Sequence, residues 1–534
     1  MILSVVVVVV ATTVVFSQTR RQIQPTKPQT NLSEIVKLVN DKQFVEAETR
    51  LKQILQKSPR DFNARTLLGI VYSETNKPDL AEKEYRTALQ INPKFITALA
   101  NLGILLAQTG KTDEAISTLE QVLKLEPNNQ GAIYNLSSLY VLRGELKKAL
   151  PLLENLAGVT KTNKTPKTTD LALLIALAKS YAALKMADEL GKTVSYIEKV
   201  GGDDVRVSFT LGLTLAQVGE YREAARLFEK VNVARPNSFE VLYNLGVAYY
   251  NINQLNSAQS ALEQVININP NAPEAFYRLG LIASEKKEVE KALGFWLKAL
   301  ELKPQYAEVN FLIGEELRKQ KKYNNALSFY EKAVAQNAEN LLYQLRLGVA
   351  YFRVKQYAEA GEIFEQMLKK YPDDFNFNYL QGFVARNQGL YDKALAAFEK
   401  ADKISPNNPD VIAGLSFIAF QRGELEKAER LLRRTLQLDA KNFSAHYDLG
   451  RLLVSQQKYA EALPILERGV DINKTDPSIR YQLFLAYSRL KMKEKANQTF
   501  AEFKRLEAEY NRTTNSKTAD ENQNSLDELE NPKP

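Results

Sequence analysis

The chain has 534 residues, of which 45% are hydrophobic and 25% charged, an ordinary composition for a protein with a large core. It contains no cysteine and a single histidine, His446, which excludes disulfides and thiolate zinc sites and disfavours histidine-dependent nucleophiles. The net charge is +8, yet residues 513–534 hold two lysines and five acidic residues, so the rest of the chain is more basic than the total. Because no basic run occurs, nucleic acid is not an expected partner.

Residues 1–17 contain an apolar run of fifteen residues. As a helix this run would span about 22 Å, which is short of the roughly 30 Å hydrocarbon core of a membrane. We therefore predict a signal peptide, cleaved before Gln18, and export to the periplasm, the outer membrane or the extracellular space. The basic residues Arg20 and Arg21 follow the run instead of preceding it, so an uncleaved membrane anchor is the alternative. Residues 18–30 are predicted to be a linker.

A unit of 34 residues recurs along most of the chain, with a small residue followed twelve positions later by an alanine. Small side chains in both columns allow two antiparallel helices to approach closely, and apolar residues at helical spacing around them supply a core. Glycines between the columns and prolines at the unit ends predict turns. The sequence therefore predicts an all-α fold of about fourteen helix pairs. The clearest column pairs are Gly69 and Ala81, Gly103 and Ala115, Gly212 and Ala224, Gly246 and Ala258, Gly280 and Ala292, Gly314 and Ala326, Gly348 and Ala360, Gly382 and Ala394, and Gly450 and Ala462.

Residues 243–250, with the sequence YNLGVAYY, resemble the first helix of the tetratricopeptide repeat family, and Pro304 stands at the family's closing proline. The resemblance covers about residues 30–508. Thirteen of the fourteen alanine positions match, and Leu190 is the exception. The resemblance implies a right-handed α-solenoid whose first helices line a concave groove that binds proteins or peptides.

The regular frame is interrupted once, which divides the predicted array. Residues 31–160 form an N-terminal block of four repeats, and residues 171–508 form a C-terminal block of ten. The polar and basic segment 161–170 between them predicts a projecting loop, which is either a docking element or joint, or a tolerated surface insertion. The polar and acidic segment 509–534 lacks an apolar period and predicts a disordered tail.

Candidate partner contacts lie on the first helix of each repeat. An aromatic residue often stands three positions before the small residue, and several arginines occur on these helices. Aromatic side chains offer large contact areas, and arginines can bind the carboxylates of an acidic peptide or a C-terminus. Packing is the alternative for the aromatic residues, and ion pairing with Glu274, Glu285, Glu308 and Glu315 is the alternative for the arginines. The candidates are Phe209, Tyr243, Asn244, Tyr277, Arg278, Phe311, Arg318, Arg346, Arg353, Tyr379 and Arg386.

Signatures of catalysis are missing from the sequence. No HExxH, GxxxxGK[ST], GxSxG or GxGxxG motif occurs, and His446 stands in a column that other repeats fill with apolar residues, which favours packing. We therefore expect no enzyme activity, no metal and no cofactor. The expected function is a protein-binding scaffold or adaptor of the cell envelope or secretion machinery. The alternative is a regulatory or assembly subunit of a separate enzyme, such as a glycosyltransferase or membrane synthase.

Overall fold

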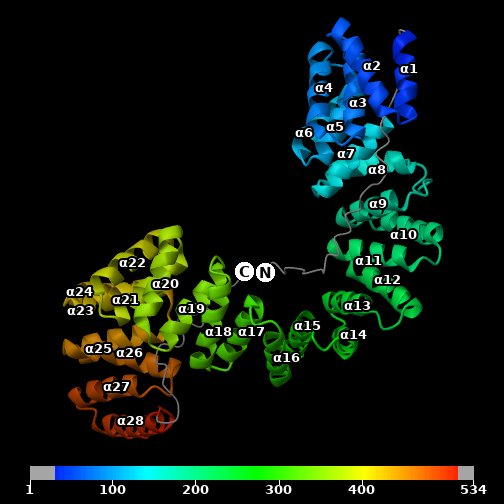
Figure 1. Ribbon diagram of the computed structural model, residues 1–534. Coiled ribbons are helices and arrows are strands. Elements are labelled where there is room, and N and C mark those ends of the chain that lie inside the picture. Colours follow the sequence, from blue (N-terminus) through cyan, green and yellow to red (C-terminus); the bar gives the residue numbers. More distant parts are fainter. Residues whose placement is uncertain (1–29, 515–534) are drawn as a thin grey trace. The chain divides into compact units, whose positions relative to one another are not determined.

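The computed structural model describes residues 30–514, which form 28 α-helices and contain no strand (Figure 1). Within each compact unit an odd-numbered helix packs against the even-numbered helix that follows it, as in α3 with α4 and α17 with α18. The 28 helices correspond in number to the fourteen predicted repeats and confirm the all-α solenoid. The predicted signal segment and almost all of the predicted linker lie outside the described residues. The tail was predicted to begin at residue 509, but helix α28 continues to Thr514 because residues 505–509 favour a helix.

The chain forms two compact units, Met1–Glu288 and Val289–Pro534. The insertion at residues 161–170 lies within the first unit. The described helices of the first unit are α1 (Thr30–Asn40), α2 (Phe44–Lys57), α3 (Phe62–Glu74), α4 (Pro78–Ile91), α5 (Ile96–Gln108), α6 (Thr112–Leu125), α7 (Gln130–Leu142), α8 (Leu146–Ala157), α9 (Leu171–Ala183), α10 (Ala187–Gly201), α11 (Val205–Gln217), α12 (Tyr221–Ala234), α13 (Phe239–Asn251), α14 (Leu255–Ile268) and α15 (Pro273–Glu285). Those of the second unit are α16 (Val289–Leu302), α17 (Ala307–Lys319), α18 (Tyr323–Gln336), α19 (Leu341–Arg353), α20 (Tyr357–Lys370), α21 (Phe375–Asn387), α22 (Tyr391–Ile404), α23 (Pro409–Gln421), α24 (Leu425–Leu438), α25 (Phe443–Ser455), α26 (Tyr459–Ile472), α27 (Pro477–Arg489) and α28 (Lys493–Thr514).

The alanine column and the glycine column have different roles in the packing of a hairpin. The alanine column is buried throughout, and even the exception, Leu190, is only 9% exposed. The glycine column makes room for the large side chain that stands four residues after the alanine. A Cβ atom on Gly69 would lie 2.5 Å from the ring of Tyr85, and one on Gly212 would lie 2.8 Å from the ring of Phe228. Glycine therefore allows a bulky side chain to pack against the first-helix backbone.

The turn inside each hairpin has one residue with positive φ, always seven positions after the small-residue column. A glycine takes this position in the five repeats where the sequence predicted a glycine turn. Elsewhere a lysine, asparagine or glutamine adopts the left-handed conformation, at some cost in backbone energy. The non-glycine residues are Lys42, Asn76, Lys185, Asn253, Lys287, Lys321, Lys355, Gln457 and Lys491.

The starts of many first helices are capped by an acidic or amide side chain that accepts backbone N–H groups of the first turn. Capping gives these helices a defined start directly after the turn that separates two repeats. The capping residues are Asp61, Asn129, Asp170, Asp204, Asn340, Asp374, Asn408, Asn442 and Asp476.

Within each unit the first helices form the tighter layer. Consecutive first helices contact one another directly, as in α3 with α5 and α11 with α13 of the first unit, and α21 with α23 and α25 with α27 of the second. In the described part of the chain, no two consecutive second helices pack against each other as extensively as these first helices do. A layer with closer spacing lies on the inner side of a curved stack, so the first helices line the inner side of each unit.

The insertion is folded against its own ends. The backbone N–H of Lys167 donates to the carbonyl of Ala157 at 2.8 Å, Val159 is 8% exposed, and Pro166 is buried. Residues 160–163 are exposed in succession, and so are Thr169 and Asp170. The predicted loop is therefore exposed in part and is held to the end of α8 by these contacts.

Candidate functional site

Three of the first-unit candidates are occupied by contacts within the unit. Tyr243 is 3% exposed, so its side chain belongs to the core. The ring of Phe209 packs 5.7 Å from that of Phe228. The amide of Asn244 donates to the carbonyl of Glu240 in its own helix at 2.8 Å. Phe209 and Tyr243 thus make the packing contacts that the sequence left as the alternative for the aromatic residues, and Asn244 bonds to its own helix.

The other two first-unit candidates lie together on α15. The guanidinium of Arg278 lies 5.4 Å from the ring centre of Tyr277, within the range of a cation–π contact. Arg278 is 3% exposed, and its Nε atom has no hydrogen-bond partner among the described residues. This arginine is therefore held by its stacking contact.

Two predicted arginines of the second unit share one carboxylate. The Nε atom of Arg346 lies 3.0 Å from Glu315 Oε1, and that of Arg318 lies 3.2 Å from the same oxygen. The hydroxyl of Tyr330 donates to Glu315 at 2.6 Å, and burial together with the charge of Glu315 raises the pKa of Tyr330. Each of these arginines thus has a carboxylate partner within the chain, although the two share it.

Three further candidates of the second unit are also packed. Arg353 is 7% exposed, with its guanidinium 5.5 Å from the ring centre of Tyr323. The ring of Phe311 stacks on that of Tyr343 at 4.6 Å. Tyr379 is 1% exposed and belongs to the core. Stacking and burial define the surroundings of all three side chains.

Arg386 on α21 has a different environment. Its guanidinium lies 4.7 Å from the ring centre of Phe383 and 4.8 Å from that of Phe417 on α23. The residue is partly exposed, and among residues 30–514 it has no hydrogen bond or ion pair of its side chain. Burial lowers the pKa of Arg386, an effect that the charge of Asp448 opposes. The two rings thus hold a charged group that lacks a carboxylate at contact distance.

A second stacked arginine follows two repeats later. The guanidinium of Arg451 on α25 lies 4.9 Å from the ring centre of Phe420 and 5.5 Å from that of Tyr447. Its Nη2 atom lies 3.4 Å from Asp448 Oδ1. Burial raises the pKa of Asp448, while Arg451 and Arg386 oppose this shift.

These two stacked arginines and their rings lie on three consecutive first helices of the second unit, and we call them the arginine–aromatic face: Phe383, which is buried, and Arg386, Phe417, Phe420, Tyr447 and Arg451, which are partly exposed. Only Arg386 among them was a predicted contact. Phe383, Phe417 and Arg451 stand one position after the small residue of their repeats, and Phe420 stands four positions after it, whereas Tyr447 stands three positions before it, in the aromatic column. Extending the column comparison to these positions would have found Phe383, Phe417 and Arg451 together, and Phe420 beside them.

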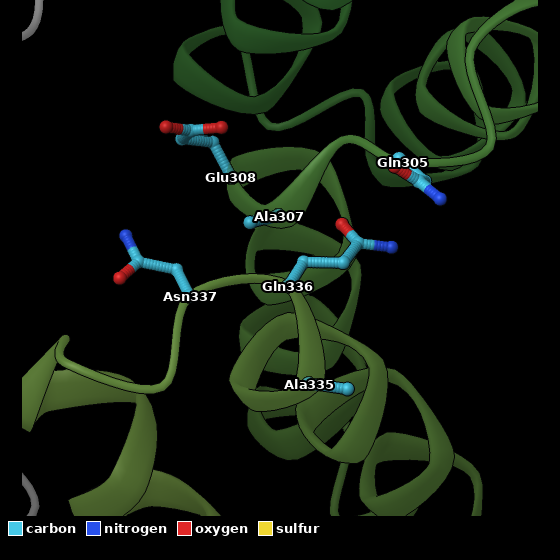
Figure 2. Close-up of a pocket in the computed structure, with 6 residues that line it drawn as sticks. All are labelled: Gln305, Ala307, Glu308, Ala335, Gln336 and Asn337. Atoms are coloured by element: carbon cyan, nitrogen blue, oxygen red, sulfur yellow. The ribbon is translucent and has the colours of Figure 1, made fainter.

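A pocket at the start of α17 and the end of α18 is open and polar. Figure 2 shows Glu308, Asn337 and Gln336 around it, and the Nε2 atom of Gln336 donates to the carbonyl of Pro304 at 3.2 Å. Its lining residues are Gln305, Ala307, Glu308, Ala335, Gln336 and Asn337. Small-molecule sites are usually apolar and enclosed, so this pocket does not define a ligand site.

No group of three or more His, Asp or Glu residues that could hold a metal ion occurs in residues 30–514. None of the helices in that range is long and apolar enough to cross a membrane. His446 is 5% exposed, with its ring nitrogens each 3.1 Å from a carbonyl oxygen, of Ile465 and Ala440, as expected for a packed side chain.

Stacked helix hairpins in a common 34-residue frame define an all-α solenoid. Profiles of the tetratricopeptide repeat match most of the chain, so the protein belongs to the tetratricopeptide repeat family, and its repeats make it a scaffold for protein–protein interaction. One profile matches residues 38–108, 106–162, 215–280, 317–382, 385–453 and 429–486, a second matches residues 356–409, and a third matches residues 273–306.

Solved structures with similar folds include yeast Tom70, at 17% identity over 81% of this chain and 96% of that one, with a TM-score of 0.32. The APC/C hetero-tetramer Cut9-Hcn1 matches at 14% identity over 85% of this chain and 95% of that one, with a TM-score of 0.34. The C-terminal part of a TPR repeat-containing protein from Cytophaga hutchinsonii matches at 20% identity over 45% and 98%, with a TM-score of 0.38. No curated protein matches the chain.

Proposed function

We propose that this protein is an exported, non-catalytic adaptor of the cell envelope or secretion machinery, and that it binds its partners on the inner side of the second unit. The arginine–aromatic face is the observation that supports partner binding. It combines partly exposed Phe417, Phe420 and Tyr447 with two stacked arginines on the layer of first helices. The apolar run and polar linker at the start of the sequence support the export half.

The composition of this face suits an interface. Aromatic residues and arginine dominate the binding energy of protein interfaces because they offer large contact areas and directional donors. The guanidinium groups of Arg386 and Arg451 are already held by ring stacking, so little side-chain entropy is lost when a partner binds. The first-unit candidates Phe209, Tyr243 and Asn244 offer less, since packing and helix contacts use them.

Site-directed photo-crosslinking in native cells tests the binding half. A photo-reactive amino acid replaces Phe417 or Tyr447 on the face, and Arg430 on the exposed surface of the second helix α24 serves as the control. We expect adducts with protein partners from the first two positions and not from the third. Adducts mainly from Arg430, or none at any position, would refute the proposed face. A single enzyme recovered in stoichiometric amounts would favour the regulatory-subunit alternative.

Protease protection tests the location separately. In intact cells we expect the array to be protected until the outer barrier is opened, while a cytosolic control protein stays protected. For a protein on the cell surface, digestion in intact cells is expected instead. An array that stays protected together with the cytosolic control after the outer barrier is opened would contradict export and leave the binding result unaffected.

A further inference from the structure

Several arginines on the first helices of the second unit have a carboxylate of this chain as an ion-pair partner. Arg318 and Arg346 pair with Glu315. Arg451 lies 3.4 Å from Asp448, and Arg480 lies 2.7 Å from Glu502. Each of these four arginines therefore has a neighbouring acidic side chain as an ion-pair partner.

Arg386 has no such carboxylate among the described residues. Asp448, whose charge acts on it, makes its ion pair with Arg451. Burial lowers the pKa of Arg386, so removing its charge from water is unfavourable in the free protein. An anion that approaches the guanidinium would relieve this unfavourable state, and the interaction would be strengthened by the reduced exposure to water.

The surroundings of Arg386 indicate which kind of anion fits. The guanidinium lies 4.7 Å from the ring centre of Phe383 and 4.8 Å from that of Phe417. A guanidinium that stacks on aromatic rings keeps its N–H donors available at the edge of its plane. An edge of this kind matches a carboxylate, which accepts two parallel N–H groups. Phe417 and Phe420 are partly exposed beside it and offer apolar contacts to the neighbouring residues of the same ligand.

We propose that Arg386 binds an aspartate or glutamate side chain within an extended acidic segment of a partner protein, while Phe417 and Phe420 contact apolar side chains next to it. This inference deepens the proposed function and rests on it. Charge complementarity supports an acidic occupant, because the chain carries a net charge of +8 and Arg386 lacks a carboxylate of its own chain.

Fluorescence anisotropy with two labelled peptides tests the inference on the full chain. One peptide alternates glutamate with leucine, and the other alternates glutamine with leucine. We expect the glutamate peptide to bind about tenfold more tightly, since a hydrogen bond to a charged group contributes roughly that factor or more. Arg386→Met is expected to abolish this preference and leave the affinity for the glutamine peptide unchanged.

The matched control is Arg422→Met, which removes a nearby arginine that pairs with Asp392 outside the arginine–aromatic face. It is expected to keep the preference. Circular dichroism melting of both variants shows whether they fold, and Arg386→Lys, which keeps the charge but not the planar fork, is expected to bind the glutamate peptide with intermediate affinity. Equal binding of the two peptides to the unaltered chain, or an unchanged preference in a folded Arg386→Met variant, would overturn the inference.

The acidic residues 515–534 of the chain itself are the competing occupant. If a chain that ends at Thr514 binds the glutamate peptide more than tenfold more tightly than the full chain, the occupant is this segment, and the partner assignment is wrong. If photo-crosslinks from Phe417 to a partner are unaffected by Arg386→Met, the adaptor function stands while the carboxylate site does not.

Discussion

The ring of Phe398 occupies the space that a side chain on Gly382 would need. A Cβ atom on Gly382 would lie 2.6 Å from the ring carbons Cδ1 and Cε1, and one on Gly414 in the next first helix would lie 2.8 Å from Cζ. Phe398 is completely buried between these two glycines. One ring therefore joins a hairpin internally and also joins it to the next repeat.

Substitution of Gly382 by alanine is expected to lower the free energy of unfolding by about 2 kcal/mol, because overpacking costs more than the roughly 1 kcal/mol of helix propensity that alanine gains. Gly294→Ala is the matched control, since a Cβ atom there meets nothing within 4 Å. This change is expected to stabilise the protein by about 0.5–1 kcal/mol. Urea unfolding midpoints measure both changes. A neutral Gly382→Ala variant would show that Phe398 can move aside.

The turn residue Lys355 has a φ of 66°. Lys355→Gly is expected to raise the free energy of unfolding by about 0.5–1 kcal/mol, because glycine adopts this conformation without the clash of a Cβ atom. The reverse change, Gly389→Ala at a φ of 75° with nothing within 4 Å of the added carbon, is expected to lower it by about 1 kcal/mol. Thermal melting compares the two variants. If the melting temperatures of the two variants shifted in the same direction, the backbone conformation of the turn would not be the cause of the effect.

Tyr351 joins two repeats, since its hydroxyl donates to Glu331 Oε1 of the preceding repeat at 2.8 Å. Burial and the carboxylate of Glu331 raise the pKa of Tyr351 to about 12 from an ordinary value of 10.0. The neutral hydroxyl therefore makes its full contribution to the free energy of unfolding below pH 10, and this contribution is lost as the pH rises through about 12. Because the pair is partly exposed, we expect Tyr351→Phe to cost only about 1 kcal/mol at neutral pH.

Urea unfolding at a series of pH values tests this contact. The stability difference between the unaltered protein and Tyr351→Phe is expected to be constant up to about pH 10 and to vanish by about 12. Tyr371→Phe is the control, since Tyr371 is 39% exposed and takes part in no such hydrogen bond. A difference that persists beyond pH 12 would contradict the role of the hydroxyl.

Glu315 balances two arginines at a partly buried position. Glu315→Gln is expected to lower the free energy of unfolding by about 2 kcal/mol, because Arg318 and Arg346 lose their shared carboxylate. Glu339→Gln removes the partner of Lys370 at a side chain that is 82% exposed, and is expected to change stability by less than about 0.5 kcal/mol. Chemical denaturation of both variants measures the contrast. Equal losses would mean that burial does not govern these pairs.

Sequence periodicity determined the helices, their pairing and the buried alanine column, because helical spacing and the room needed at a helix crossing depend on residues close in the chain. The frame of 34 residues placed all predicted arginines on first helices, where the structure has them. The proposed signal segment stays a prediction, since it lies outside the described residues.

Tertiary structure decided what each of these side chains meets. In the sequence, ligand binding and ion pairing were both open for Arg346 and Arg386, but in the structure Arg346 pairs with Glu315, whereas Arg386 stacks on two phenylalanine rings. The division after Glu288 was likewise absent from the repeat pattern. The physical reason is that ion pairing and burial depend on side chains from other repeats. The periodic pattern places these side chains along their helices, but it does not show which of them contact one another.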